Sequence, residues 1–137
     1  MGWLMNEEKA LKLFAACYNA RDFSKLLSRL HRKATYTAYN RFYVSSLKEG
    51  VSRLLMEKAE ELRAVEPPNR AYHGFVETPR SLTGTRVDPC LVLTRHLPWQ
   101  ELGIVRIKCT LLHIKDIRIL DPATHAHTRA DLAGKEG

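Results

Sequence analysis

Tyrosine and histidine side chains are the groups in this chain whose chemistry could build a binding or catalytic site. A tyrosine combines an apolar ring with a hydroxyl that needs a hydrogen-bond partner, and a neutral imidazole can act as a general base near pH 7. Packing in the core or at an interface is the alternative role for each of them. The tyrosines in or beside predicted elements are Tyr18, Tyr36, Tyr39, Tyr43 and Tyr72, and the histidines on three predicted strands are His73, His96 and His113.

Cysteine, metal and cofactor chemistry has a weaker basis in this sequence. Cys17, Cys90 and Cys109 are an odd set without CxxC spacing, each inside an apolar segment, which predicts buried small hydrophobes rather than disulfides. A metal site needs three or more converging ligands, and the pair His125 and His127 is too short a signal to predict one. Phosphate-binding glycine loops and the common hydrolase motifs do not occur, so no cofactor is expected.

Length and charge limit the classes of protein that the chain can belong to. Its 137 residues predict one domain. The net charge of +7 arises mainly in residues 1–65, where 12 Lys and Arg face 7 Asp and Glu. A stripe at helical spacing could bind phosphates or an acidic partner, or it could simply be a solvated helix face. Because no aromatic residues interleave the stripe, nucleic acid is not an expected partner. The stripe consists of Arg21, Lys25, Arg29 and Arg32.

No targeting or membrane signal is visible in the sequence. No apolar run approaches the roughly 18 residues that span a bilayer, and residues 1–6 carry no basic region ahead of an apolar one. We therefore expect a cytoplasmic protein with no membrane partner.

Three helices are predicted in the first half of the chain. Asn6 is a good N-cap for a helix over 7–19, and Asp22 can cap a short helix over 23–30. Ser46-Leu47-Lys48-Glu49 has the form of a capping box and opens the longest helix, 47–64. The apolar side of that helix is predicted to consist of Leu47, Val51, Leu54, Leu55, Ala59 and Leu62.

The rest of the chain reads as strands. Alternating apolar residues predict strands over 34–40, 71–78, 86–97, 103–113 and 115–120, with a loop at 98–102. The order α-α-β-α-β-β-β-β with short connections predicts an α+β domain, residues 1–121, with N-terminal helices packed on a mostly antiparallel sheet. From Pro122 the apolar pattern fades, so 122–137 is predicted to be a C-terminal tail or arm.

One strand is apolar on both faces, which bears on assembly. Leu91 and Leu93 alternate with Cys90 and Val92, and a strand of that kind is covered on both sides. The side chains of the 103–113 strand predicted to face the helices are Val105, Ile107, Cys109 and Leu111. With the helices needed on one face, the other cover must be the tail or a second subunit, and a homodimer through the sheet is the expectation.

Two segments resemble a known superfamily. The string N-A-R-D-F-S-K-L-L…L…K-A-T-Y in residues 19–36 and the string S-L-K-E-G-V-S-R-L-L in 46–55 resemble the opening of nuclear transport factor 2-like, or SnoaL-like, proteins. The glycine here follows the glutamate, unlike the family's usual helix opening. The resemblance implies a cone, in which helices and a curved sheet enclose a pocket. The implied pocket lining is Phe14, Tyr18, Tyr36, Leu54, Tyr72, Cys109 and His113.

The same resemblance allows the catalytic positions of known members to be tested. In ketosteroid isomerase-like members a carboxylate on the first strand is the base, assisted by a tyrosine; those positions fall on Ala38 and Phe14 here. A site like that of limonene epoxide hydrolase needs inward carboxylates, and the strands offer only Glu77, Asp88 and Asp116. A scytalone dehydratase-like arrangement of His, Asp and Tyr stays open.

No catalytic residue is assigned on these grounds. The expected function is a pocket for an apolar small molecule, with isomerase, cyclase or dehydratase chemistry left open. The alternative is a non-catalytic dimeric interaction or adaptor module.

Overall fold

The computed structural model describes residues 4–40, 45–80 and 84–129 of the chain. It contains three helices and seven strands within those ranges. The helices are α1 (Glu7–Ala20), α2 (Ser24–Leu27) and α3 (Lys48–Arg63). The strands are β1 (Leu30–Ala38), β2 (Ser45–Ser46), β3 (Arg70–Arg80), β4 (Gly84–His96), β5 (Trp99–Cys109), β6 (Ile114–Leu120) and β7 (His127–Arg129).

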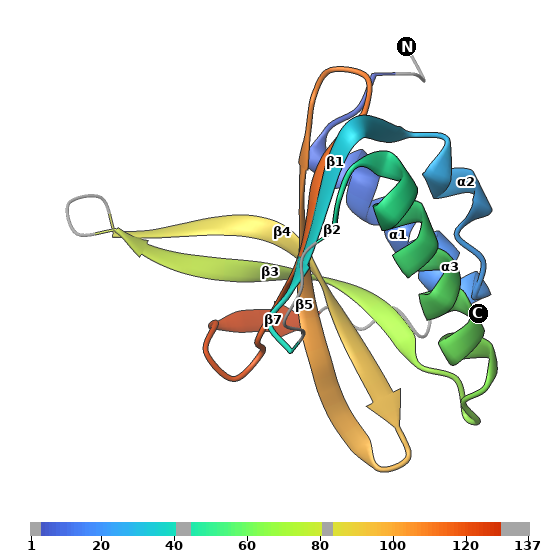
Figure 1. Cartoon of the computed structure of the whole chain (residues 1–137). Helices are drawn as coiled ribbons and strands as arrows, with labels where there is room; N and C mark the ends of the chain where they lie inside the picture. Colours follow the sequence, from blue (N-terminus) through green and yellow to red (C-terminus); the bar gives the residue numbers. More distant parts are fainter. Residues whose placement is uncertain (1–3, 41–44, 81–83, 130–137) are drawn as a thin grey trace.

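The strands form one curved sheet in the order β2-β1-β6-β5-β4-β3-β7. Only β1 and β6 pair in parallel within the described ranges, and the other pairs are antiparallel. All three helices lie on one side of the sheet (Figure 1). The predicted α+β architecture, with N-terminal helices on a mostly antiparallel sheet, is confirmed.

Helix α1 forms where the sequence predicted it, and α2 is shorter than predicted. The Asn6 side chain accepts a hydrogen bond from the backbone N–H of Lys9 at 2.8 Å, and Arg21 ends the helix in the left-handed conformation. Helix α2 does not extend to residue 30, because the chain enters the sheet there: Leu30 begins β1, and the carbonyl of Arg29 accepts from the N–H of Ile114. The cation stripe therefore does not lie on one helix.

The predicted capping box at the start of α3 is wrong. Ser45 and Ser46 instead pair with β1 as a two-residue strand, and the N–H of Leu47 donates to the carbonyl of Ala34 at 2.8 Å. Leu47, with φ at 99°, becomes the N-cap, and no side chain hydrogen-bonds to the helix end. Tertiary pairing thus outweighed the local capping signal.

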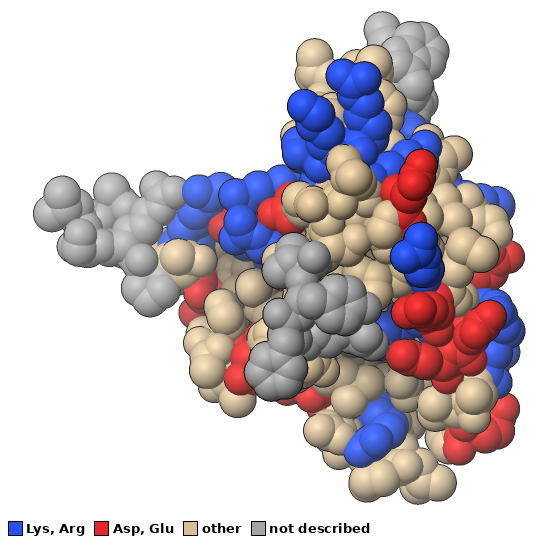
Figure 2. All heavy atoms as spheres, in the orientation of Figure 1, with Lys and Arg blue, Asp and Glu red and all other residues tan. Residues whose placement is uncertain are grey.

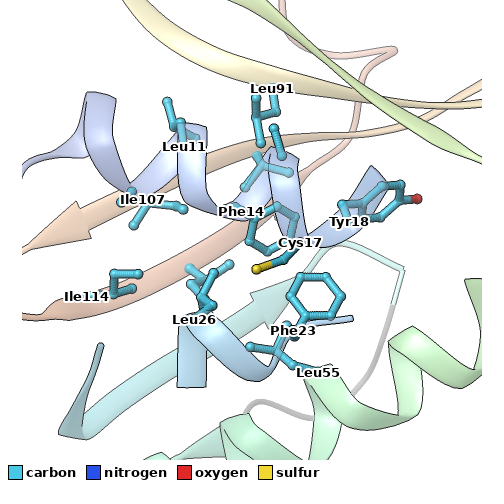
Figure 3. Close-up of a cluster of buried hydrophobic side chains, with 14 of the residues drawn as sticks. Leu11, Phe14, Cys17, Tyr18, Phe23, Leu26, Leu55, Leu91, Ile107 and Ile114 are labelled. Carbon is cyan, nitrogen blue, oxygen red and sulfur yellow. The ribbon is translucent and has the colours of Figure 1, made fainter. Parts of the chain in front are cut away.

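The core lies between the helices and the sheet, as Figure 3 shows. The ring of Phe14 meets the ring of Phe23 edge-on, with centroids 5.3 Å apart, and Cys17 is buried beside them. Among the three free cysteines, Cys17 and Cys90 are buried, as predicted, and Cys109 is half-buried. Burial raises the pKa of both the Cys90 and the Cys109 thiols to about 11, which keeps them protonated at neutral pH.

Strand β4 is covered on both faces by this single chain. Leu91 and Leu93 pack into the main core beneath the helices, whereas Cys90 and Val92 pack on the outer face with residues of β3 and β5. The outer side chains are fully buried without a second subunit. The sequence argument for a homodimer therefore loses its premise.

The segment after β6 supplies cover for this outer face. Strand β7 pairs with β3, while β6 lies on the far side of β5 and β4, so residues 121–126 must cross the sheet. Gly74 of β3 permits this contact, because the carbonyl of Thr128 occupies the space that a Cβ would need. The guanidinium of Arg129 lies 4.7 Å from the ring of Tyr72 and 4.5 Å from that of Trp99. Part of the predicted tail is thus a strand of the sheet.

The far halves of β3 and β4 leave the sheet as a two-stranded arm. Strand β4 pairs with β5 only as far as Leu91 and Val105, whereas its pairing with β3 continues to the Arg80–Gly84 pair. Figure 1 shows this arm projecting to the left. Glu7 of α1 takes the place of β4 beside β5, accepting from the N–H of Ile107 at 3.1 Å and from the guanidinium of Arg106 at 2.8 and 3.0 Å.

Strand β5 begins and ends four residues earlier than predicted. It pairs with β4 from the His96–Trp99 pair onward, so the predicted loop at 98–102 is reduced to the two residues between His96 and Trp99. At the other end the N–H of Thr110 donates to the carbonyl of His113 at 2.9 Å and closes a turn. Leu111, predicted to face the helices, lies in this turn and is 76% exposed.

The two adjacent leucines of α3 should differ strongly in their contribution to stability. Leu55 is 1% exposed, whereas Leu54, predicted from sequence to face inward, is only partly buried at the edge of the core. Leu55→Ala should lower the free energy of unfolding by about 2–5 kcal/mol, and Leu54→Ala should lower it clearly less. Urea unfolding of both variants measures the two free energies. Because both variants replace leucine by alanine on the same helix, the change in helix propensity is the same in each. Equal losses would show that α3 faces the sheet differently.

Candidate functional site

The candidate site is a cavity at one end of the core, between α1, α3 and the sheet. Its volume is about 270 Å³. The wall combines aromatic rings with amide, phenol and ammonium groups, and its accessible surface is more polar than apolar. The lining residues are Phe14 and Tyr18 of α1, Tyr36 and Ala38 of β1, Lys58 of α3, Leu93, Gln100 and Leu102 of the β4–β5 hairpin, Ile119 of β6, and Tyr39, Asn40 and Asn69 from loops.

Three of the residues proposed from the resemblance meet at this cavity. Phe14, Tyr18 and Tyr36 line it together, with 2%, 2% and 7% of their surface exposed. They converge because α1 crosses the sheet with its aromatic side toward β1. In Figure 3 the hydroxyl of Tyr18 points away from the cluster of apolar side chains.

The other four proposed residues lie elsewhere. Leu54 and Cys109 are half-buried at the margin of the core. Tyr72 pairs with Val92 and shares its face, so it lies on the outer side of the sheet, away from the helices. His113 belongs to the turn after β5, where its ring lies 5.8 Å from that of His31.

Tyr18 is held in its neutral form. Burial raises the pKa of its phenol well above the usual range, although the hydrogen bond from Asn69 acts in the opposite direction. A neutral phenol is a hydrogen-bond donor rather than a base. Across the cavity, the hydroxyl of Tyr39 donates to the carbonyl of Leu102 at 2.8 Å.

Asn69 supplies a polar group that lacks a partner. Its Oδ1 atom is buried and accepts no hydrogen bond from any described residue. A buried acceptor left unsatisfied costs about 1–3 kcal/mol, so a donor placed in the cavity would remove that cost. Lys58 provides the positive charge among the described lining residues, and its Nζ atom also pairs with Oε2 of Glu61 at 3.3 Å.

The cavity contains no carboxylate and no imidazole among its described lining residues. Ala38 and Phe14, where ketosteroid isomerase-like members carry the base and the tyrosine, are indeed part of the wall. Two of the three strand carboxylates named from the sequence are engaged elsewhere: Asp88 pairs with Arg86 at 2.9 Å and Asp116 with Arg118 at 2.8 Å. General-base chemistry by a carboxylate therefore has no group in the described wall.

The histidines on and near the strands do not reach the cavity. His73 is half-buried toward α1, where burial and the nearby Lys12 lower its pKa. His96 lies on the outer face, with its Nε2 atom 3.1 Å from the hydroxyl of Thr94 and 3.4 Å from that of Tyr72. The scytalone dehydratase-like arrangement thus lacks its histidine in the described lining.

Besides Asn40, which follows β1, three polar lining residues were not predicted from the sequence. Asn69 lies in the linker before β3, Lys58 on a helix rich in charge, and Gln100 in what was predicted to be a loop. None of them stands out by spacing or by neighbours. No sequence signal could have identified them, because their convergence depends on three separate elements.

The described residues contain neither a metal-binding cluster nor a membrane-spanning helix. No group of three or more His, Cys, Asp or Glu side chains that could hold a metal ion occurs among them. Within the same ranges, no helix has the length and apolar character to cross a membrane.

Comparison with known proteins identifies the fold. No protein-family model matches the chain, and no curated protein matches it significantly. An uncharacterized cystatin-fold protein from Novosphingobium aromaticivorans superposes with a TM-score of 0.52 at 17% identity, covering 85% of this chain and 99% of that one. ActVI-ORFA from Streptomyces coelicolor superposes with a TM-score of 0.53 at 9% identity, covering 85% and 97%. These likenesses show the fold alone.

The chain should not isomerise ketosteroids. Ala38 cannot abstract a proton and Phe14 cannot donate a hydrogen bond, and both line the cavity. A spectrophotometric assay with a standard unsaturated ketosteroid should show no rate above the uncatalysed background. Measurable turnover would mean that a group outside the described wall acts as the base.

Proposed function

We propose that this chain is a small-molecule-binding protein whose ligand occupies the cavity lined by Phe14, Tyr18 and Tyr36. The observation that supports it most directly is the buried Oδ1 atom of Asn69 without a partner, next to an aromatic wall. Buried acceptors in folded proteins are rarely left without a partner. A ligand that donates a hydrogen bond there would complete the site.

The size of the cavity limits the ligand to about one ring. Its volume of about 270 Å³ lies just below the roughly 300–1,000 Å³ range of drug-sized pockets, and a cavity of about 150 Å³ is enough for benzene. The aromatic rings favour a planar apolar body. Asn69 favours a donor such as a phenolic hydroxyl, and Lys58 favours an anionic group at the mouth. The chemical class is therefore a small hydroxylated aromatic compound, with or without a carboxylate.

Binding, rather than acid–base catalysis, is the role that the described groups support. The tyrosine hydroxyls can orient a ligand, and Lys58 can neutralise its charge. An isomerase, cyclase or dehydratase reaction at this site would need its proton acceptor from the ligand or from outside the described wall.

A larger side chain in the cavity should weaken the binding of a small phenol. Phenol and 4-hydroxybenzoate are titrated against the full chain by amide NMR shifts, and we expect saturable shifts at residues around the cavity. Ala38→Leu should weaken the apparent affinity by at least about tenfold, because the added carbons of the leucine occupy the space of the ring. Ala16→Leu, on the exposed side of α1, is the matched control and should leave binding unchanged.

Replacing the polar lining residues by apolar ones then identifies which of them contacts the ligand. Asn69→Leu should remove the preference for phenol over benzene, and Lys58→Met should remove any preference for 4-hydroxybenzoate over phenol. Absence of saturable binding of either probe, or equal binding by Ala38→Leu and wild type, would overturn the proposal.

A dimeric interaction module is the second candidate, and the arm favours it. Phe75 and Val87 are 51% and 55% exposed on the same face of the β3–β4 arm, beside Pro89. A two-stranded hairpin is only marginally stable in water by itself, and apolar side chains on it favour a partner. We therefore keep the homodimer through the sheet as a proposal, now with the arm as its contact surface.

The mass in solution tests the second candidate. Light scattering at micromolar concentration should give twice the chain mass for wild type and one chain mass for the double variant Phe75→Ser, Val87→Ser. Met56→Ser, at an equally exposed site on α3, is the control and should stay dimeric. A monomeric wild type would exclude this dimer while leaving the cavity proposal intact.

A further inference from the structure

The turn between β5 and β6 forms an apolar tip at one end of the sheet. Leu111 and Leu112 are 76% and 47% exposed. Leu4, 38% exposed, lies next to them, because the N–H of Met5 donates to the carbonyl of Leu111 at 2.7 Å. Figure 1 shows this turn at the top of the molecule. Single exposed leucines are ordinary, but two on a projecting turn with a third beside them indicate a contact surface.

Cations surround this tip. Residues 29–33 carry three Lys or Arg and residues 108–115 carry two, with two histidines and no Asp or Glu in either segment. The two segments lie side by side, because Leu30 pairs with Ile114 and the Nζ atom of Lys115 donates to the carbonyl of Lys33 at 2.8 Å. Figure 2 shows Lys and Arg side chains gathered at this end of the molecule.

The backbone of the tip has its hydrogen bonds largely made. The N–H of Thr110 donates to the carbonyl of His113, whose own N–H donates to Oγ1 of Thr110 at 3.1 Å. The carbonyl of Leu112 accepts from the guanidinium of Arg29 at 3.3 Å. Backbone groups left unpaired are costly where water is scarce. Together with the bond from Met5 to Leu111, these bonds satisfy the carbonyls of both leucines and reduce the cost of entering such a region.

We propose that this tip docks the protein on an anionic membrane surface. Leu111 and Leu112 insert between the lipid headgroups, while the cations of residues 29–33 and 108–115 contact headgroup phosphates and carboxylates. The combination is specific, because an apolar centre within a cationic ring matches the layered chemistry of the membrane interface. A nucleic acid would use the cations but not the leucines, and it would call for aromatic rings on this surface. Contact with a surface requires no spanning helix, and it is independent of the cavity function.

The leucines and the cations should each contribute a measurable part of the affinity for the membrane. A Lys or Arg near an anionic surface contributes about fivefold in affinity, and screening by salt should weaken that part. Replacing an inserted leucine by serine should cost about tenfold. Reversing the charge of two of these cations should therefore reduce the salt dependence, and the leucine variant should retain it in full at lower affinity.

Co-sedimentation of the full chain with vesicles tests the proposal. The vesicles are phosphatidylcholine alone or phosphatidylcholine with roughly 30% phosphatidylserine. The variants are Leu111→Ser with Leu112→Ser, and Arg32→Glu with Lys33→Glu. The controls are Leu97→Ser, which is 74% exposed in the turn at the other end of β5, and Arg53→Glu on the exposed side of α3. Thermal unfolding verifies that all variants fold.

We expect the wild-type chain to bind only the vesicles that contain phosphatidylserine. Each tip variant should weaken that affinity at least about tenfold, and the control variants should leave it unchanged. Equal binding by the tip variants and wild type, or equal losses in the controls, would overturn the proposal. Failure of the wild-type chain to bind the phosphatidylserine vesicles would also overturn it. Tight binding to duplex DNA that the charge reversal abolishes and the leucine variant leaves intact would assign the surface to nucleic acid instead.

Discussion

The structure depends on the need of β4 to bury both of its faces. Leu91 and Leu93 on one face and Cys90 and Val92 on the other are almost wholly excluded from water. Each such side chain contributes roughly 1.5–3 kcal/mol when fully buried, so neither face can be left open. The inner face receives α1 and the aromatic core, and the outer face receives the segment that returns to form β7.

The separation of β4 from β5 has consequences at both ends of the molecule. Beyond Leu91 the two strands diverge, and Glu7 of α1 satisfies the exposed edge of β5 through Ile107 and Arg106. This contact ties the start of α1 to the sheet and so helps to set where Phe14 and Tyr18 reach the interior. The same divergence leaves the arm with Phe75 and Val87 exposed.

The three surfaces considered for function are spatially and chemically distinct. The cavity combines aromatic rings with the unsatisfied Oδ1 of Asn69 and suits a small ring compound. The arm presents the apolar side chains of Phe75 and Val87 beside the Arg86–Asp88 ion pair. The β5–β6 turn combines Leu111 and Leu112 with cations. A cone fold of this kind carries function in such local sites, and the fold by itself selects none of them.

The amino-acid sequence by itself determined the helices α1 and α3, the run of strands and the α+β layering, because apolar periodicity, and for α1 the Asn6 cap, act within a few neighbours. It also indicated that β4 is covered twice and that Phe14, Tyr18 and Tyr36 could share a pocket. Only the tertiary structure decided the rest. Pairing with β1 displaced the capping box at Ser46, the tight β4–β5 turn shifted β5 and placed Leu111 in solvent, and Gly74 admitted β7 against the sheet. The convergence of Lys58, Asn69 and Gln100 on one cavity was likewise invisible, since it arises from contacts between segments far apart in the chain.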